Sequence, residues 1–144
     1  MGPLGHSLAA LMAIGLTPAV ALALLVRPSL RFGLGERFGR IDVVPPGSEG
    51  AIWVHASSVG EAKAACRLVE ALESAEQPVR TSTSTTPGRE VFRRERPHGE
   101  ATLLPLDHPW LTEAALRRTR PSLAVMIETE LWPSWIAACA RQSV

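Results

Sequence analysis

The longest apolar stretch without charge lies near the beginning of the chain. Residues 8–26 read LAALMAIGLTPAVALALLV, in which a threonine is the only polar side chain. As a helix these residues would be about 28 Å long, close to the hydrocarbon thickness of a bilayer. Arginines follow from Arg27 onward, whereas residues 1–7 contain neither lysine nor arginine. Because positive charge collects on the cytoplasmic side, the pattern predicts a membrane anchor in residues 1–40, with a cytoplasmic domain after it.

The alternative for this segment is a helix buried in the protein or lying on the bilayer surface. Pro18 can kink the helix, and its alanines and glycines make it only moderately apolar. A cleaved signal peptide fits less well, because its positive charges precede its apolar run. The position of the arginines therefore favours the anchor.

Short apolar runs alternate with helical patterns after residues 41–50, a Pro- and Gly-rich stretch that we interpret as a linker. Strands are expected at residues 51–56, 79–84, 101–106 and 123–127. Helices are expected at residues 61–74, 89–96, 107–118 and from 132 onward. Four such alternations predict a parallel sheet flanked by helices, an α/β Rossmann-like domain over residues 41–144.

Two helix ends lead to further expectations. Asp107 stands two residues before Pro109, and aspartate is a favoured N-cap, so it is expected to cap the helix over residues 107–118. The last helix reaches Val144 without a Gly or Pro stop signal. We therefore expect the chain to be the front part of a longer protein.

Composition narrows the class of protein. Fifteen basic and fourteen acidic residues give a formal charge of +1, which argues against a nucleic-acid-binding protein. The two cysteines form no CxxC pair and the four histidines no HExxH spacing, so neither a disulfide framework nor a metal site is predicted. No cofactor is expected either.

Candidate chemistry lies in the loops after the strands, where open α/β sheets bind their ligands. The first loop reads HASSVGE from His55 to Glu61. In it Gly60 permits a close turn into the helix, and Ser57 or Ser58 can cap that helix. Glu61 in the first turn is a candidate general base, although the field at a helix start favours its charged form, which burial would have to offset. The alternative is that Glu61 lies at a helix start without a catalytic role.

The second loop runs from Thr83 to Arg89 and contains several hydroxyl groups. Together with Gly88 at a helix start, Arg89 is predicted to bind a substrate phosphate or carboxylate. The alternative is a solvated helix face, because arginines and glutamates continue to Arg96.

The third loop, ETELWP, follows an apolar strand and contains two acids separated by one residue, Glu128 and Glu130. Two carboxylates at the end of a buried strand are costly to bury without partners, so they indicate a site. The alternative is a helix start that favours acids, which explains one glutamate more readily than both.

The remaining histidines and tryptophans are expected to have structural roles. We interpret His55 as a core residue, or one that supports the site, rather than as a catalyst. His108 is expected to shape its loop, and Trp110 and Trp135 are expected to pack rather than to form a sugar-binding platform.

Three motifs occur in a fixed order: WVHASSVGE at residues 53–61, LPLDHP at 104–109 and ETELWP at 128–133. With GERFG at residues 35–39 behind an apolar segment, they closely resemble the 3-deoxy-D-manno-octulosonic acid (Kdo) transferase family of lipopolysaccharide synthesis. The resemblance covers nearly the whole chain, and the pair HxxSVGE and ETELWP is a specific signal.

The resemblance implies an inverting, membrane-associated glycosyltransferase of the GT-B type, with two Rossmann-like domains facing a cleft. Such enzymes transfer Kdo from CMP-Kdo to a lipid A precursor on the cytoplasmic face of the inner membrane. By the same resemblance Glu61 is the general base and Glu128 supports the transition state. Ser57, Ser58 and Gly60 would shape the acceptor side, and Glu130 belongs to the predicted substrate-binding residues.

The chain departs from the family pattern in two ways. The C-terminal domain that holds CMP-Kdo in the family is absent, so the 144 residues alone are expected not to transfer sugar. Ser134 stands where many relatives have asparagine after ELWP. Two alternatives remain: another GT-B enzyme that uses a UDP- or GDP-sugar, and an anchored α/β half-domain without catalytic activity.

Overall fold

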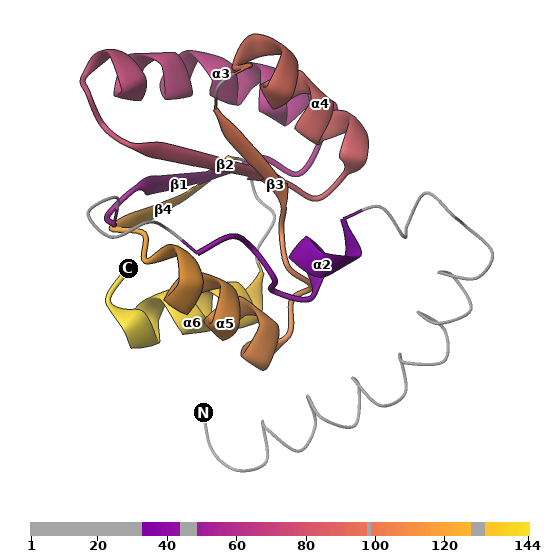
Figure 1. The fold of residues 1–144 in the computed structure, drawn as a ribbon, viewed down its shortest axis with the longest axis vertical. Coiled ribbons are helices and arrows are strands. Elements are labelled where there is room, and N and C mark those ends of the chain that lie inside the picture. The colour runs from indigo at the N-terminus through magenta and orange to yellow at the C-terminus, as the bar shows by residue number, and fades with distance from the viewer. Residues whose placement is uncertain (1–32, 44–48, 98, 128–131) are drawn as a thin grey trace, which may run out of the picture. The chain divides into compact units, whose positions relative to one another are not determined.

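A computed structural model describes residues 33–43, 49–97, 99–127 and 132–144. In these residues the strands form one parallel sheet with the order β3-β2-β1-β4 (Figure 1). The strands are β1 (Ile52–His55), β2 (Val79–Thr83), β3 (Glu100–Leu103) and β4 (Leu123–Met126). The helices are α2 (Leu34–Arg37), α3 (Val59–Ser74), α4 (Thr86–Glu95), α5 (Pro109–Thr119) and α6 (Pro133–Gln142). The predicted α/β fold with a parallel sheet is confirmed.

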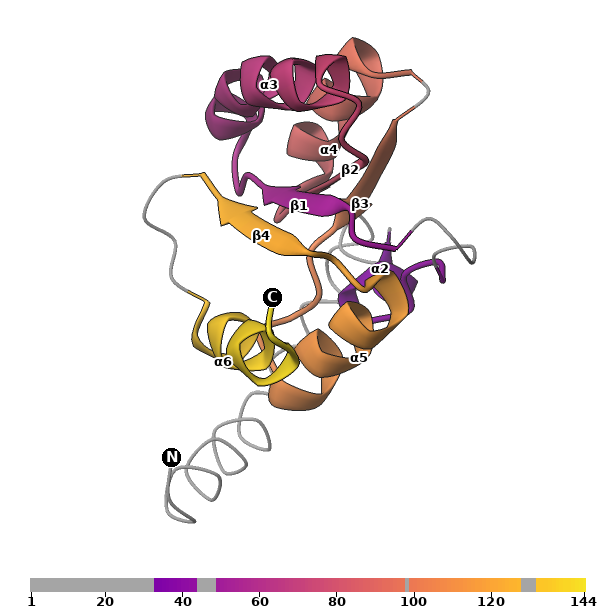
Figure 2. The same cartoon turned by 90° about the vertical axis from the view of Figure 1, so that its left-hand side faces the viewer.

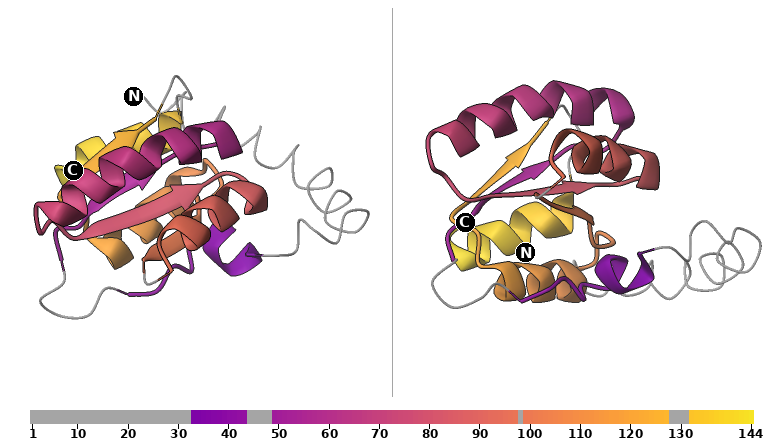
Figure 3. Two further views of the ribbon diagram at one scale, coloured as in Figure 1. Left: turned by 90° about the horizontal axis from the view of Figure 1, so that it is seen from above. Right: turned by 45° about the horizontal axis from the view of Figure 1, so that its top comes forward.

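Helices cover both faces of the sheet, with α3 and α4 on one face and α5 and α6 on the other (Figures 2 and 3). The alternation of side chains along β1 explains why both faces are apolar. Val54 packs in the cluster beneath α3 and α4, whereas its neighbour Trp53 packs in the cluster beside α5 and α6. A strand buried on both faces reads as a continuous apolar run, as strands of parallel sheets do.

The two clusters differ in the size of their side chains. Under α3 the packing residues are small, among them Ala62 and Ala65, with Phe92 of α4 filling the remaining space. On the other face Trp53 meets Trp135 of α6 edge to face, with 4.6 Å between the ring centroids. The predicted packing role of Trp135 is therefore confirmed. Trp110, in contrast, is 78% exposed, so the expectation of a packing role for Trp110 was wrong.

Two element boundaries differ from the sequence-based expectation. Helix α4 begins at Thr86 rather than Arg89, because the Thr85 side chain accepts a hydrogen bond from the Gly88 N–H and proline is favoured in a first turn. The stretch at residues 41–50 is not a linker at its start. Ile41 is buried in the core, and its carbonyl accepts a hydrogen bond from Arg118 Nε at 2.8 Å.

The LPLDHP motif caps two helices, one of them unexpectedly. The α5 N-cap is His108, whose Nδ1 accepts a hydrogen bond from the Trp110 N–H, which agrees with its predicted loop-shaping role. The expectation that Asp107 caps α5 was wrong. Its carboxylate instead accepts hydrogen bonds from the N–H groups of Ser134 at 3.3 Å and Trp135 at 3.0 Å, in the first turn of α6.

The predicted membrane anchor, residues 8–26, lies outside the described residues. Within the part of the chain that the structure describes, no helix is both long and apolar enough to cross a bilayer. Residues 35–144 form one compact unit, which contains the predicted site loops.

Candidate active site

Three of the loops singled out in the sequence begin at the same edge of the sheet, because all four strands are parallel. His55 at the end of β1 pairs with Ser82 in β2 and with Met126 in β4. The loops after β1 and β2 are therefore neighbours, and β4 ends at the same edge. Glu128 and Glu130, which follow β4, lie outside the described residues, and their predicted roles stay predictions.

Glu61 is held by its own helix start in a variant of the capping box. Ser58 is the N-cap of α3, and its Oγ accepts a hydrogen bond from the Glu61 N–H at 3.3 Å. In return, Glu61 Oε1 accepts from the Ser58 hydroxyl at 2.9 Å and Oε2 accepts from the Ser57 N–H at 2.7 Å. The side chain is only partly buried. An ionised carboxylate has about four acceptor positions, so this oriented group can still accept a proton from a ligand.

Gly60 does not have the conformational role that we expected in the turn into α3. It does not have a positive φ, and a Cβ added there would meet only Ser58 Oγ, at an ordinary 3.9 Å. The turn into α3 therefore does not require a glycine. Gly60 is exposed, and its predicted role on the acceptor side stays a prediction.

A buried polar network lies directly behind this loop. His55 is 2% exposed, and its Nε2 lies 3.2 Å from Ser57 Oγ and 3.4 Å from Ser84 Oγ. Its Nδ1 lies 3.0 Å from Ser82 Oγ, which also accepts a hydrogen bond from Trp53 Nε1 at 2.7 Å. The prediction that His55 is a core or supporting residue is confirmed by its burial.

Arg89 does not lie on a solvated helix face. It is 5% exposed, and its Nη1 donates to both carboxylate oxygens of Glu36, at 3.0 and 3.3 Å. Glu36 Oε2 also accepts a hydrogen bond from the Leu103 N–H at 2.8 Å. Arg96 is likewise buried and paired with Glu73. Only the other arginines of this run are exposed. Substrate binding by Arg89 stays a prediction.

Sequence reasoning missed Arg37, which supports the second loop. Its Nη2 donates to the Ser84 carbonyl at 2.9 Å, across 47 residues of sequence. Burial lowers the pKa of the Arg37 guanidinium and the charge of Arg89 adds to this effect, while Glu36 opposes it. The only signal in the sequence was the GERFG motif, which contains Glu36 and Arg37 but has no recognisable chemistry of its own.

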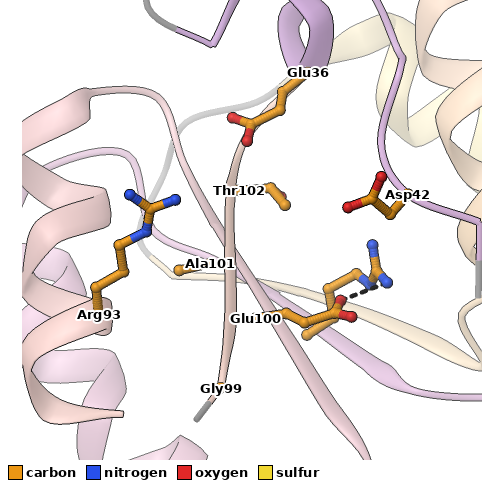
Figure 4. A pocket seen from close by; sticks show the side chains of 8 residues that line it. Glu36, Asp42, Arg93, Gly99, Glu100, Ala101 and Thr102 are labelled. Carbon is orange, nitrogen blue, oxygen red and sulfur yellow. Dashed lines mark ion pairs between the residues drawn. The ribbon is translucent and has the colours of Figure 1, made fainter. Parts of the chain in front are cut away.

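A pocket of about 240 Å³ lies elsewhere, beside β3 (Figure 4). Its charged lining consists of three carboxylates and two guanidinium groups, and Arg80 is paired with Glu100. None of the described site candidates lines this pocket. In the described ranges, no group of three or more His, Cys, Asp or Glu side chains is placed to hold a metal ion.

A comparison with known protein families identifies the family of this chain. A model of the 3-deoxy-D-manno-octulosonic-acid transferases (kdotransferases) matches residues 33–144, more than three quarters of the chain. The chain belongs to this family. The match begins before GERFG and includes all four motifs, so Arg37 and Glu36 lie within the Kdo transferase domain together with Glu61.

Individual Kdo transferases agree with the family match. A 3-deoxy-D-manno-octulosonic acid transferase of Bordetella pertussis is 34% identical over 98% of this chain and 36% of its own length. A probable mitochondrial one of Arabidopsis thaliana is 34% identical over 73% of this chain and 24% of its own length. That of Haemophilus influenzae is 32% identical over 81% and 28%. The chain thus spans about a third or less of the length of these relatives.

Proposed function

We propose that the protein containing this chain is a glycosyltransferase that moves Kdo from CMP-Kdo to a lipid A precursor, with inversion at the anomeric carbon. The family membership of the chain supports the Kdo transfer. In this reaction the acceptor hydroxyl oxygen bonds to the anomeric carbon, the bond from that carbon to the CMP phosphate breaks, and the hydroxyl proton leaves to a base.

Glu61 is the base in this proposal, and the geometry of its carboxylate is the observation that carries it. Donors from Ser57 and Ser58 fix both oxygens, while the side chain is still accessible at the carboxyl edge of the sheet. A base that is oriented before the substrate arrives contributes through position as well as through proton acceptance.

The cellular setting follows from the same proposal. A lipid-linked acceptor lies in a membrane, and the predicted anchor with its following arginines would hold the domain at the cytoplasmic face of the inner membrane. Arginine side chains after an anchor are also attracted to anionic lipid head groups. This part rests on the sequence pattern of residues 8–40.

The substitution Glu61→Gln, made in the full-length protein, tests the proposal. Glutamine can still accept the hydrogen bond from the Ser57 N–H but cannot take a proton, so turnover of CMP-Kdo should fall about 100- to 10,000-fold. Binding of CMP-Kdo, measured by calorimetry, should stay within about twofold of the parent protein, because the substitution leaves the donor contacts intact.

Glu70→Gln is the matched control, because Glu70 is an exposed glutamate further along the same helix. It should leave turnover unchanged. Near-normal turnover of the Glu61→Gln protein would remove Glu61 from the role of base. Transfer from a UDP- or GDP-sugar, with none from CMP-Kdo, would contradict the proposed donor.

A further inference from the structure

Trp53, Ser82 and His55, in the network behind Glu61, are closed to solvent, so the polar hydrogen atoms of these three side chains need acceptors in the protein. Trp53 and Ser82 are 0% exposed and His55 is 2% exposed. A buried polar group without a hydrogen bond destabilises the folded state. The positions of the hydrogens can therefore be worked out from the heavy atoms.

The direction of the bonds is set at Ser82. An indole N–H can only donate, so Ser82 Oγ is the acceptor of the 2.7 Å bond from Trp53 Nε1. Among the described contacts of the Ser82 hydroxyl, the acceptor left for its own hydrogen is His55 Nδ1, at 3.0 Å. Nδ1 must then have a lone pair, which places the single ring proton of a neutral His55 on Nε2.

The Nε2–H group has serine hydroxyls in front of it in two loops. Ser57 Oγ lies at 3.2 Å in the loop after β1, and Ser84 Oγ lies at 3.4 Å in the loop after β2. Ser57 is also the residue whose backbone N–H donates to Glu61 Oε2 at 2.7 Å. The His55 ring therefore connects Ser82 in β2 to Ser57, whose N–H binds the Glu61 carboxylate.

We propose that His55 is a positioning residue, which acts as the neutral tautomer with its proton on Nε2. Trp53 and Ser82 set this tautomer, and the Nε2–H group fixes Ser57. Through the Ser57 N–H, His55 fixes the direction of the Glu61 carboxylate. The tautomer is argued from the hydrogen bonds of the fully buried Ser82 hydroxyl, while the effect on turnover rests on the proposed function of Glu61.

Long-range ¹H–¹⁵N NMR of the 144-residue chain tests the tautomer directly, because protonated and unprotonated ring nitrogens have well-separated ¹⁵N shifts. We expect a protonated Nε2 and an unprotonated Nδ1 for His55 at neutral pH. A proton on Nδ1, or on both nitrogens, would overturn the proposal. This measurement uses the unaltered chain, so it does not depend on whether a variant folds.

The variant Ser82→Ala tests what sets the tautomer. Without the hydroxyl, Nδ1 loses its donor, so the Nε2-protonated form should no longer be the single state, and the Ser57 amide signal should shift. His108, outside the network, should keep its signals in the same spectra and serves as the internal control. An unchanged His55 pattern would show that Ser82 does not set it and would contradict the proposal.

Two variants in the full-length protein separate positioning from packing. His55→Gln keeps an N–H donor that can reach Ser57, whereas His55→Leu keeps bulk without any donor. Misplacing a reacting group by about 1 Å can cost about 100-fold, so kcat of the leucine variant should fall by about that factor with little change in KM. The glutamine variant should recover at least about a tenth of the parent kcat.

Equal losses in the two variants, with both folded by circular dichroism, would overturn positioning and leave His55 a packing residue. The outcome can be told apart from a failure of the proposed function. If Glu61→Gln turns over normally while the NMR results hold, the proposed base is wrong and the tautomer is right.

Discussion

Helices α3 and α6 both follow strands at the carboxyl edge of the sheet, but their first turns are capped in opposite ways. The cap of α3 is local, since Ser58 and Glu61 are three residues apart and bond to each other. The cap of α6 is distant, since Asp107 reaches the N–H groups of Ser134 and Trp135 from 27 and 28 residues earlier. Trp132, at the N-cap position of α6, makes no cap bond through its side chain to the described residues.

The difference separates two uses of an acid at a helix start. In α3 the capping acid is also the candidate base, so one set of hydrogen bonds both stabilises the helix and orients the carboxylate. In α6 the acid comes from LPLDHP, and the first turn does not require one from ETELWP. Glu128 and Glu130 of that motif lie outside the described residues, and their predicted roles stay predictions.

The largest effect is expected for Asp107→Ala, which removes the distant cap. Two N–H groups of α6 lose a charged acceptor, so the chain should lose about 2 kcal/mol of stability in urea unfolding. Each helix contains one buried free cysteine, Cys66 in α3 and Cys139 in α6, and burial raises the pKa of both thiols. A thiol reagent can therefore label these cysteines only after the helix that contains them opens. In the Asp107→Ala chain, Cys139 should react with the reagent about 30-fold faster than in the parent chain, whereas the rate at Cys66 should not change.

Asp107→Asn is the control for this prediction, because its amide oxygen can still accept one of the two hydrogen bonds. It should cost about half as much as the alanine variant. If Asp107→Ala accelerates both thiols equally, opening is global and the two helix starts are not independent.

A smaller effect is expected for Ser58→Ala, which removes the local cap without altering Glu61 itself. Loss of a serine N-cap typically costs about 1 kcal/mol. Cys66 should then react about fivefold faster, whereas the rate at Cys139 should not change. Ser74→Ala, at the exposed other end of α3, should alter neither rate. No change at Cys66 in the Ser58→Ala chain would mean that the capping box does not stabilise α3.

The smallest effect, and one of opposite sign, is expected for Gly60→Ala. Gly60 lies in the first turn of α3 without a positive φ, so alanine should raise stability by about 0.5–1 kcal/mol. Urea unfolding of the Gly60→Ala chain measures this gain. Gly39→Ala is the contrasting control. Gly39 has φ +75° and an added Cβ would lie 2.9 Å from the Leu111 carbonyl, so this change should destabilise.

The sequence predicted the parts of the fold that depend on near neighbours. Strand and helix alternation appears as apolar runs between turn residues, and Ser58 with Glu61 forms a recognisable cap signal. Partners far apart in sequence could not be predicted. Asp107 precedes α5 by two residues, which suggested the wrong helix, and nothing local indicates that Glu36 pairs with Arg89 or that Arg37 reaches Ser84. The burial of His55 was expected, but the direction of its hydrogen bonds required the neighbouring strand.

The segment that includes Gly39 is held through its main chain as well as through its side chains. The Arg37 carbonyl accepts from the Leu106 N–H, the Ile41 carbonyl accepts from Arg118, and the Gly39 backbone abuts the Leu111 carbonyl. Substitutions at Phe38 or Arg40, which are both exposed, would leave these main-chain contacts unchanged. Displacement of this segment would therefore be opposed by α5 and by the strand-to-helix loop before it.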